Sequence, residues 1–234
     1  MSKINKKEEK VKPLFVGDVH GNWNSLREII ETNNPEIIIQ CGDFGFFPHF
    51  IDFFEGNSTT KVYWCDGNHE NHEQLNEMVN FYGRKPIELS ENCFYMPRGS
   101  TLKLDDGRNV LFMGGALSID KCYRTEGRDY FRSETISDRD LIDLTDDLIV
   151  DIVVSHTAPN KFKIPMRGQT NYNSIDRYHP LYDPSRDALD YILLKYHPAM
   201  WVFGHFHHFA RGTDLGCSWF MLDTSIDADG CMFL

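Results

Sequence analysis

The sequence predicts an α+β domain in which a mixed β-sheet, or two stacked sheets, has helices on its outer faces. Three observations predict this fold class. Short apolar strands alternate with amphipathic helices in the first third of the chain, the middle carries short strands joined by a turn signal, and the chain from Met200 onward is rich in strand formers. The 234 residues suffice for one large domain with its own core.

The first third alternates strands and helices. Asn22 or Asn24 can cap a first helix, because an asparagine side chain accepts hydrogen bonds from the free N–H groups of an opening turn. Pro35 ends that helix, since a proline disfavours helical backbone in the residue before it. The elements expected are strands at 14–17, 36–40 and 61–65, with one helix after the first strand and a second helix at 72–81.

The rest of the chain is expected to contain more antiparallel strands. Asp105-Asp106-Gly107 is a good hairpin turn, because Asp-Gly favours the positive φ angles of a tight turn. The elements expected are strands at 93–96, 101–104, 109–113 and 149–154, and helices at about 137–147 and at 185–196. Residues 1–12 are expected to form a solvated tail, and residues 13–234 a single domain.

The charge balance limits the partners that we expect. Thirty-five acidic residues against 24 lysines and arginines give a formal net charge of −11, which excludes a broadly basic nucleic-acid-binding surface and gives an anionic membrane no attraction. No stretch approaches the roughly 18 apolar residues of a membrane span, and no signal-peptide pattern is present. The six cysteines form no C-x-x-C pair, which indicates free thiols. We therefore expect a cytoplasmic protein without a membrane partner, for which long nucleic acid is an unfavourable ligand; the oligomeric state stays open.

Five polar clusters each follow directly on an apolar strand. Loops at the carboxyl ends of parallel strands converge on one edge of a sheet, so clusters far apart in sequence can meet in space. Their donors are oxygens and imidazoles without a thiolate, which suits Mn²⁺, Fe or Zn²⁺. Seven such donors are too many for one ion and fit two adjacent ions that share a carboxylate. The donors are Asp18, His20, Asp43, Asn68, His156, His205 and His207, with His69 beside Asn68.

The order of these motifs resembles that of the calcineurin-like metallophosphoesterase superfamily, in particular its short stand-alone bacterial-type members. The motifs are GD-x-HG at 17–21, GD at 42–43, GNHE at 67–70, SH at 155–156 and GH-x-H at 204–207. The resemblance covers about residues 14–222 and implies a four-layer α/β/β/α fold, two stacked mixed sheets flanked by helices. It also implies two divalent ions, with Mn favoured and Fe, Zn, Ni or Co as alternatives. The implied activity is hydrolysis of a P–O ester of a small molecule or nucleotide by a hydroxide that bridges the ions.

The resemblance also implies a role for each residue. One ion is expected at Asp18, His20 and His207, and the other at Asn68, His156 and His205. Asp43 is expected to bridge them. His69 is the expected catalytic residue, which contacts the substrate and protonates the leaving group or stabilises its charge.

The second motif departs from that of the Ser/Thr phosphatases in this superfamily. Phe46 stands where those enzymes have the aspartate that pairs with the catalytic histidine, and Phe47 stands where they have an arginine that grips phosphate. This argues against a Ser/Thr protein phosphatase and against a symmetrical dinucleoside tetraphosphate hydrolase. Which carboxylate orients His69, if any does, stays open, with Asp66 and Glu70 as candidates.

A polar loop near the predicted site could hold the substrate phosphate, or it could be a solvated loop whose basic residues pair with Asp120, Glu126 and Asp129. The segment after Gly114 carries Lys121 and Arg124, of which Arg124 is the better candidate, and Arg98 is a further one. Three alternatives remain: a phosphodiesterase or nuclease with the same metal site, a non-catalytic scaffold, and a cysteine phosphatase that uses the C-x₅-R spacing of Cys122 and Arg128.

Overall fold

The structure is a computed structural model that describes residues 12–47, 59–165, 179, 182–227 and 229–233. Two six-stranded mixed sheets form its centre, as the fold class predicts. The first sheet has the order β12-β1-β2-β3-β5-β4. Its parallel strands are β1 (Leu14–Val16), β2 (Ile37–Gln40), β3 (Lys61–Trp64) and β5 (Cys93–Tyr95), and its antiparallel edges are β12 (Cys231–Phe233) and β4 (Ile87–Ser90).

The second sheet repeats this plan in the order β10-β11-β9-β8-β7-β6. Its parallel strands are β11 (Cys217–Met221), β9 (Met200–Phe203), β8 (Ile152–Ser155) and β7 (Asn109–Met113), and its antiparallel edges are β10 (Ala210–Asp214) and β6 (Thr101–Lys103). As expected, the antiparallel strands β4, β6, β10 and β12 all come later in the chain, after residue 86. The same part of the chain also supplies the parallel strands of the second sheet, which were not expected. Each sheet is parallel at its centre and antiparallel at its two edges.

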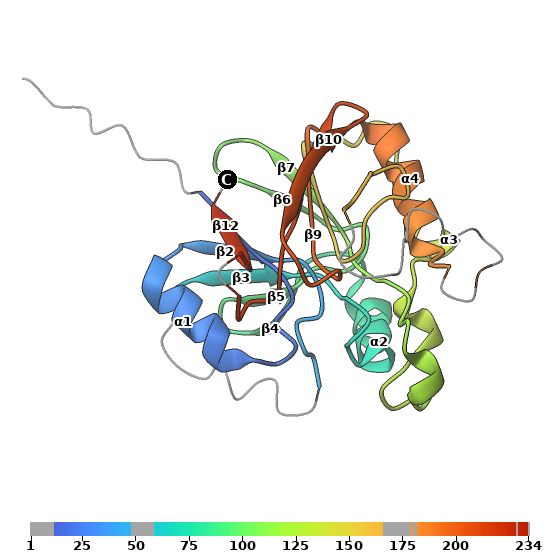
Figure 1. Cartoon of the computed structure of the whole chain (residues 1–234), viewed down its shortest axis with the longest axis horizontal. Coiled ribbons are helices and arrows are strands. Elements are labelled where there is room, and N and C mark those ends of the chain that lie inside the picture. The colour runs from blue at the N-terminus through green and yellow to red at the C-terminus, as the bar shows by residue number, and fades with distance from the viewer. Residues whose placement is uncertain (1–11, 48–58, 166–178, 180–181, 228, 234) are drawn as a thin grey trace, which may run out of the picture.

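Helices cover the outer face of each sheet, which gives the four layers. α1 (Trp23–Asn33) and α2 (His72–Tyr82) pack on the first sheet, and α4 (Ser185–Tyr196) packs on the second; Figure 1 shows α1 and α4 on opposite sides of the molecule. Strand alternation builds this arrangement, because successive side chains point to opposite faces. In β1, Leu14 and Val16 face the helices, whereas Phe15 lies in the core between the two sheets.

The helix starts follow the expected chemistry. Asn22, rather than Asn24, caps α1 by accepting a hydrogen bond from the Ser25 backbone N–H at 3.3 Å. Asn71 caps α2 in the same way through Gln74 at 3.2 Å. These caps begin each helix directly after a polar cluster of the first sheet, so the caps also fix where those clusters turn.

Two elements differ from the sequence predictions. The helix expected at 137–147 is only α3 (Asp138–Leu141), which begins with a capping box formed by Ser137 and Asp140. Further along, the Asp147 side chain accepts a hydrogen bond from Thr145, a local contact that competes with helical backbone bonds. The edge strand β4 was not expected, since it is short and its pairing with β5 is interrupted by a bulge.

Other expectations concern membrane-spanning helices, the cysteines and the N-terminal residues. None of the helices in the described ranges is both long and apolar enough to cross a membrane. All six cysteines are free, and Cys122 is exposed. The expected tail of residues 1–12 falls outside the described residues except for Lys12.

Candidate metal centre

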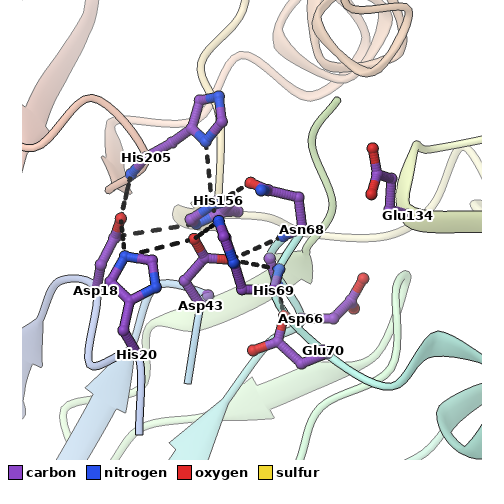
Figure 2. A network of polar contacts seen from close by, with 12 residues as sticks. Asp18, His20, Asp43, Asp66, Asn68, His69, Glu70, Glu134, His156 and His205 are labelled. Atoms are coloured by element: carbon purple, nitrogen blue, oxygen red, sulfur yellow. Dashed lines mark hydrogen bonds and ion pairs between the residues drawn. The ribbon is translucent and has the colours of Figure 1, made fainter. Parts of the chain in front are cut away.

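All five polar clusters lie at the carboxyl ends of central parallel strands, and the structure brings them together. The loops after β1, β2 and β3 come from the first sheet, and those after β8 and β9 come from the second. Figure 2 shows their side chains converging around Asp43. The two stacked sheets therefore contribute to one polar site where their strands end.

The first candidate ion group consists of Asp18, His20 and His207, whose ligand atoms lie within 4.8 Å of one another. Asp18 Oδ2 lies 3.1 Å from His207 Nε2 and 3.8 Å from His20 Nε2. The two histidine Nε2 atoms are 3.1 Å apart. One carboxylate oxygen and two imidazole nitrogens thus converge as an N/O ligand set for a divalent transition metal.

The second candidate ion group forms around His156. Its Nε2 atom lies 3.1 Å from Asn68 Oδ1 and 3.2 Å from His205 Nδ1. Asp43 Oδ1 lies 3.3 Å from the same nitrogen, whereas Asp43 Oδ2 lies 3.7 Å from His20 Nε2 of the first group. The Asp43 carboxylate therefore stands between the two groups with one oxygen toward each.

Glycines leave the space into which these ligands fit. A Cβ atom added at Gly42 would lie 2.6 Å from His156 Nδ1, one at Gly67 would lie 2.1 Å from Asp43 Oδ1, and one at Gly204 would lie 2.0 Å from Asp18 Oδ1. Any larger residue at these three positions would displace a candidate ligand.

The backbone of the ligand loops is itself unusual. His20, Asp43, His205 and His207 have φ angles of 50°, 52°, 70° and 49°, in the left-handed region that non-glycine residues rarely adopt. Such strained residues concentrate at functional sites, where the surrounding structure holds them in place. Here backbone amides help to hold them: the N–H groups of Asn68 and His69 both donate to Asp43 Oδ1 at 2.8 Å.

The two carboxylates of the site require positive charge. Asp18 and Asp43 are buried, and their ion pairs among the described residues are all to histidines. Burial alone would lower the pKa of His156, but Asp43 and Asp18 outweigh it and raise that pKa to about 10. Burial and the neighbouring His156 lower the pKa of His205. In the metal-free site, a proton on His156 partly balances the negative charges of Asp18 and Asp43. A divalent cation would displace that proton and balance both charges, so the donor set fits metal ions.

His69 lies at the mouth of the site. Its Nε2 atom is 3.9 Å from Asp43 Oδ2 and 2.7 Å from Arg124 Nη2. Burial lowers the pKa of His69; Asp43 opposes this shift and Arg124 adds to it. An arginine can only donate, so His69 Nε2 accepts this hydrogen bond and the proton of the neutral ring is on Nδ1.

Neither candidate carboxylate orients His69. Glu70 instead accepts the backbone N–H groups of Phe44 at 2.6 Å and Gly67 at 2.8 Å, so it ties two ligand loops together. Asp66 pairs with Arg98 at 2.6 Å. Among the described residues, the hydrogen-bond partner of His69 Nε2 is the guanidinium of Arg124, with the Asp43 carboxylate further away at 3.9 Å.

The three predicted substrate-binding cations lie in different surroundings. Arg124 lies at the site, held by Asp120 through a 2.8 Å ion pair and by the Asp129 carbonyl. Lys121 lies three residues away on a short 3₁₀ turn, Lys121–Tyr123, and is partly exposed. Arg98 is buried, and all three of its guanidinium nitrogens donate to protein acceptors, so Arg98 has a structural role and the prediction that it binds substrate is not supported.

The cysteine phosphatase alternative lacks its loop. Cys122 is exposed on the 3₁₀ turn and does not lie between a strand and a helix, the setting that a phosphate-cradling loop requires. The Arg128 guanidinium pairs with Asp129 at 3.1 Å. The C-x₅-R spacing here is a coincidence of sequence.

Sequence reasoning missed Ser118 and Glu134. Ser118 Oγ accepts a hydrogen bond from the Asn68 side-chain amide at 3.2 Å, and Glu134 accepts two hydrogen bonds from Ser118. Ser118 lies in a segment that the sequence marked as polar and near the site. Nothing in the sequence marked Glu134, which lies sixteen residues further on.

Comparisons with known proteins agree with this geometry. A family model described as calcineurin-like phosphoesterase matches residues 11–209. Phosphopantetheinyl hydrolase (PptH) from Mycobacterium tuberculosis is similar in structure, with a TM-score of 0.55 and 13% identity over 96% of each chain. GAP50, described as the anchor in the inner membrane complex of Plasmodium, has a TM-score of 0.52 and 10% identity over 96% of this chain and 76% of its own. A comparison with curated protein sequences gives no significant match.

Structural likenesses at such low identity show the fold alone. The family model carries more, because it matches most of the chain and spans every candidate ligand from Asp18 to His207. The order of motifs, the four layers and the converged ligand loops all agree with that match. The chain belongs to the calcineurin-like phosphoesterase family.

Proposed function

We propose that this protein is a binuclear metal-dependent phosphoesterase that hydrolyses a P–O ester of a small molecule or nucleotide. The observation that carries the proposal is the position of Asp43, whose two carboxylate oxygens face two separate ligand groups. Asp18, His20 and His207 would hold one ion, and Asn68, His156 and His205 the other. When bound, two such ions supply a hydroxide nucleophile at neutral pH and neutralise charge on the phosphoryl oxygens.

The chain's own residues would bind and orient the phosphoryl group. Arg124 carries a full positive charge beside the site, and Asp120 and the Asp129 carbonyl hold its other nitrogens. The Nη2 atom that now donates to His69 is the one placed to donate to a substrate oxygen. Arg124 would thus take the role of the arginine that the Ser/Thr phosphatases have at the position of Phe47, although it comes from a different segment of the chain.

Binding of this kind would also free His69 for catalysis. A phosphoryl oxygen that accepts the hydrogen bond from Arg124 leaves His69 Nε2 without its present donor. The ring can then rearrange its proton to face the leaving oxygen and protonate it, a contribution worth about 10²–10⁴-fold in rate.

The substrate is expected to be compact. The protein carries a formal net charge of −11, so a long polyanion spread over its surface would be repelled, whereas a small ester need only reach the ions and Arg124. Tyr123 is 90% exposed next to Arg124, where its ring is available to stack on a base. A nucleotide or other small phosphoester fits these features better than duplex DNA.

The test is a metal analysis joined to a hydrolysis screen. Protein purified without chelator should contain about two transition-metal ions per chain and should hydrolyse members of a nucleotide and metabolite panel with Mn²⁺, losing activity in EDTA. Comparing bis-p-nitrophenyl phosphate with p-nitrophenyl phosphate separates a diesterase from a monoesterase. Absence of both bound metal and Mn²⁺-dependent activity on every ester would overturn the proposal and favour a non-catalytic scaffold.

A further inference from the structure

Behind the second ion group, three buried polar side chains form a chain of hydrogen bonds, which we name the Glu134 relay: Glu134, Ser118 and Asn68. Glu134 Oε1 accepts the Ser118 backbone N–H at 2.6 Å, and Glu134 Oε2 accepts the Ser118 hydroxyl at 2.8 Å. The Ser118 oxygen in turn accepts the Asn68 side-chain amide at 3.2 Å. All three residues are buried, and Figure 2 shows Glu134 beyond Asn68, on the side away from Asp18 and His20.

The chemistry of donors and acceptors sets the direction of this relay. At pH 8, where Glu134 is mainly ionised, its carboxylate can only accept hydrogen bonds, so the single hydroxyl hydrogen of Ser118 points at Glu134. The Ser118 oxygen is left with lone pairs alone and can only accept from Asn68. The Asn68 NH₂ group must therefore face Ser118, and its carbonyl oxygen must face His156, from whose Nε2 it lies 3.1 Å.

This direction matters because the two ends of an asparagine side chain differ chemically. The carbonyl oxygen is a metal ligand, whereas the NH₂ group has no lone pair to offer to an ion. An aspartate ligand would present an oxygen in either orientation. A chain that uses asparagine at this position therefore needs a device that fixes which end faces the ions.

The relay is also anchored to the backbone of the same loop. The Glu134 carbonyl accepts hydrogen bonds from the Ala116 N–H at 3.1 Å and from Arg98 at 2.8 Å. Arg98 pairs in turn with Asp66, two residues before Asn68. Gly115 lies in this contact at a φ of 98°, and a Cβ atom there would come within 2.6 Å of the Glu134 carbonyl oxygen. Glu134 is thus held at a fixed distance from the loop that carries the ligand.

We propose that Glu134 is a positioning residue which, through Ser118, fixes the orientation of the Asn68 amide and so sets the affinity of the second ion group for its metal. The inference rests on the proposed function, since it requires Asn68 to be a ligand. A side chain that merely filled space would be replaced by glutamine without consequence, because the shape and the number of hydrogen bonds are kept.

Glu134→Gln is informative because it reverses the relay. Glutamine keeps an oxygen for the Ser118 N–H, but its NH₂ group then donates to the Ser118 oxygen. The hydroxyl hydrogen turns toward Asn68, which must present its carbonyl oxygen to it and its NH₂ group to the ions. Ser118→Ala, by contrast, only releases the amide. The double variant, Ser118→Ala with Glu134→Gln, lacks the hydroxyl, so the glutamine cannot change the orientation of the Asn68 amide through Ser118.

The experiment is a Mn²⁺ titration of the chelator-treated full chain at pH 8, where Glu134 is mainly ionised. Binding is measured by calorimetry and by the electron paramagnetic resonance signal of free Mn²⁺. Wild type should bind two ions. In Glu134→Gln, one binding step should weaken by about 10–100-fold, as is typical when an outer partner of a ligand is lost, while the other step stays unchanged. Ser118→Ala should show a smaller loss in the same step, and the double variant should be no worse than Ser118→Ala alone.

The matched control is Glu126→Gln, which changes an exposed carboxylate that pairs with Arg132 elsewhere in the same segment. It should titrate like wild type. If wild type binds two ions and Glu134→Gln gives the same two steps, the positioning role is overturned while the binuclear proposal stands. Additive losses in the double variant would overturn it too. If wild type binds fewer than two ions, the proposed binuclear centre fails and the inference fails with it.

Discussion

Two buried aspartates on neighbouring loops, Asp43 and Asp66, differ in their nearest charged partner, although Asp66 also has a histidine, His72, at 3.9 Å. Asp66 is paired with a permanent cation, since Arg98 contacts it at 2.6 Å and Tyr95 donates to it at 3.1 Å. Within the described part of the chain, the ion pairs and hydrogen bonds of the Asp43 side chain are to histidines and backbone amides. Its charge is therefore balanced by histidines, which can lose their protons. Both carboxylates are almost fully buried. Burial alone therefore does not distinguish a structural carboxylate from a metal ligand.

The difference lies in what each partner can release. A guanidinium stays charged at any physiological pH, so the pair of Asp66 and Arg98 is closed to other ligands. An imidazole can give up its proton to a competing metal ion, so Asp43 remains open to one. The loop from Asp66 to Asn68 joins the Asp66–Arg98 pair, which we call the closed network, to Asp43 and its histidines, which we call the open network. The closed network therefore supports the open one.

The largest effect is expected from Asp43→Asn. Asparagine keeps one oxygen and loses the charge, so one ion group would lose its Asp43 ligand and the bridge between the groups would be broken. Mn²⁺-dependent phosphoester hydrolysis should therefore fall by about 10⁴-fold or more. Steady-state kinetics with metal analysis measures this loss, and circular dichroism checks that the fold is kept. Activity close to wild type would remove Asp43 from the site.

On the Asp66 side of the comparison, Arg98→Met should damage the fold rather than the chemistry. It leaves Asp66 buried without its cation, which typically costs about 3–5 kcal/mol of unfolding free energy. Urea unfolding of metal-free protein measures this cost. Adding Asp66→Asn should recover part of it, because the unpaired charge is then gone. A variant as stable as wild type would mean that the pair is not a support for the ligand loop.

The sequence predicted the open network far better than the closed one. The seven candidate metal ligands lie within a few residues of the ends of five strands, so local motifs and the convergence of parallel strand ends place them together. The pairing of Arg98 with Asp66, and that of Glu134 with Ser118, joins segments that no local pattern connects. The strand β7 and the helix α4 were predicted at their observed ends for the same local reason, whereas the short bulged edge strand β4 left no periodic signal.

A smaller effect on catalysis is expected from Arg124→Ala. Loss of one charged hydrogen bond to the substrate phosphate is worth about 1.5–3 kcal/mol, so kcat/KM should fall by about 10–100-fold, with KM raised. Metal content should not change, because Arg124 contacts His69 and no ion ligand. Arg128→Ala, in the same segment but paired with Asp129 at the surface, is the control and should keep wild-type kinetics. An unchanged KM for Arg124→Ala would exclude Arg124 from substrate binding.

The smallest effect is expected on the unfolding free energy, when the buried Glu134 of the relay ionises. Burial raises the pKa of Glu134 to about 7, against opposing hydrogen bonds from Ser118 and the charge of Arg124, with Asp183 adding to the rise. A carboxyl group whose pKa is higher in the folded state binds more protons there than in the unfolded chain. The metal-free protein should therefore lose on the order of 1–3 kcal/mol of unfolding free energy as the pH rises from about 4.5 to about 7.

Glu134→Gln cannot titrate, so this loss should be missing from its urea unfolding curves measured at pH 5 and pH 8, whereas Glu126→Gln should follow wild type. The variant would then be the more stable protein at pH 8 and the weaker metal binder, which a purely structural carboxylate could not explain. If the unfolding free energies of wild type and Glu134→Gln changed equally between pH 5 and pH 8, the Glu134 charge would carry no cost in stability. In that case the comparison of Asp43 with Asp66 could not be extended to Glu134, because its buried charge would carry no measurable cost in stability.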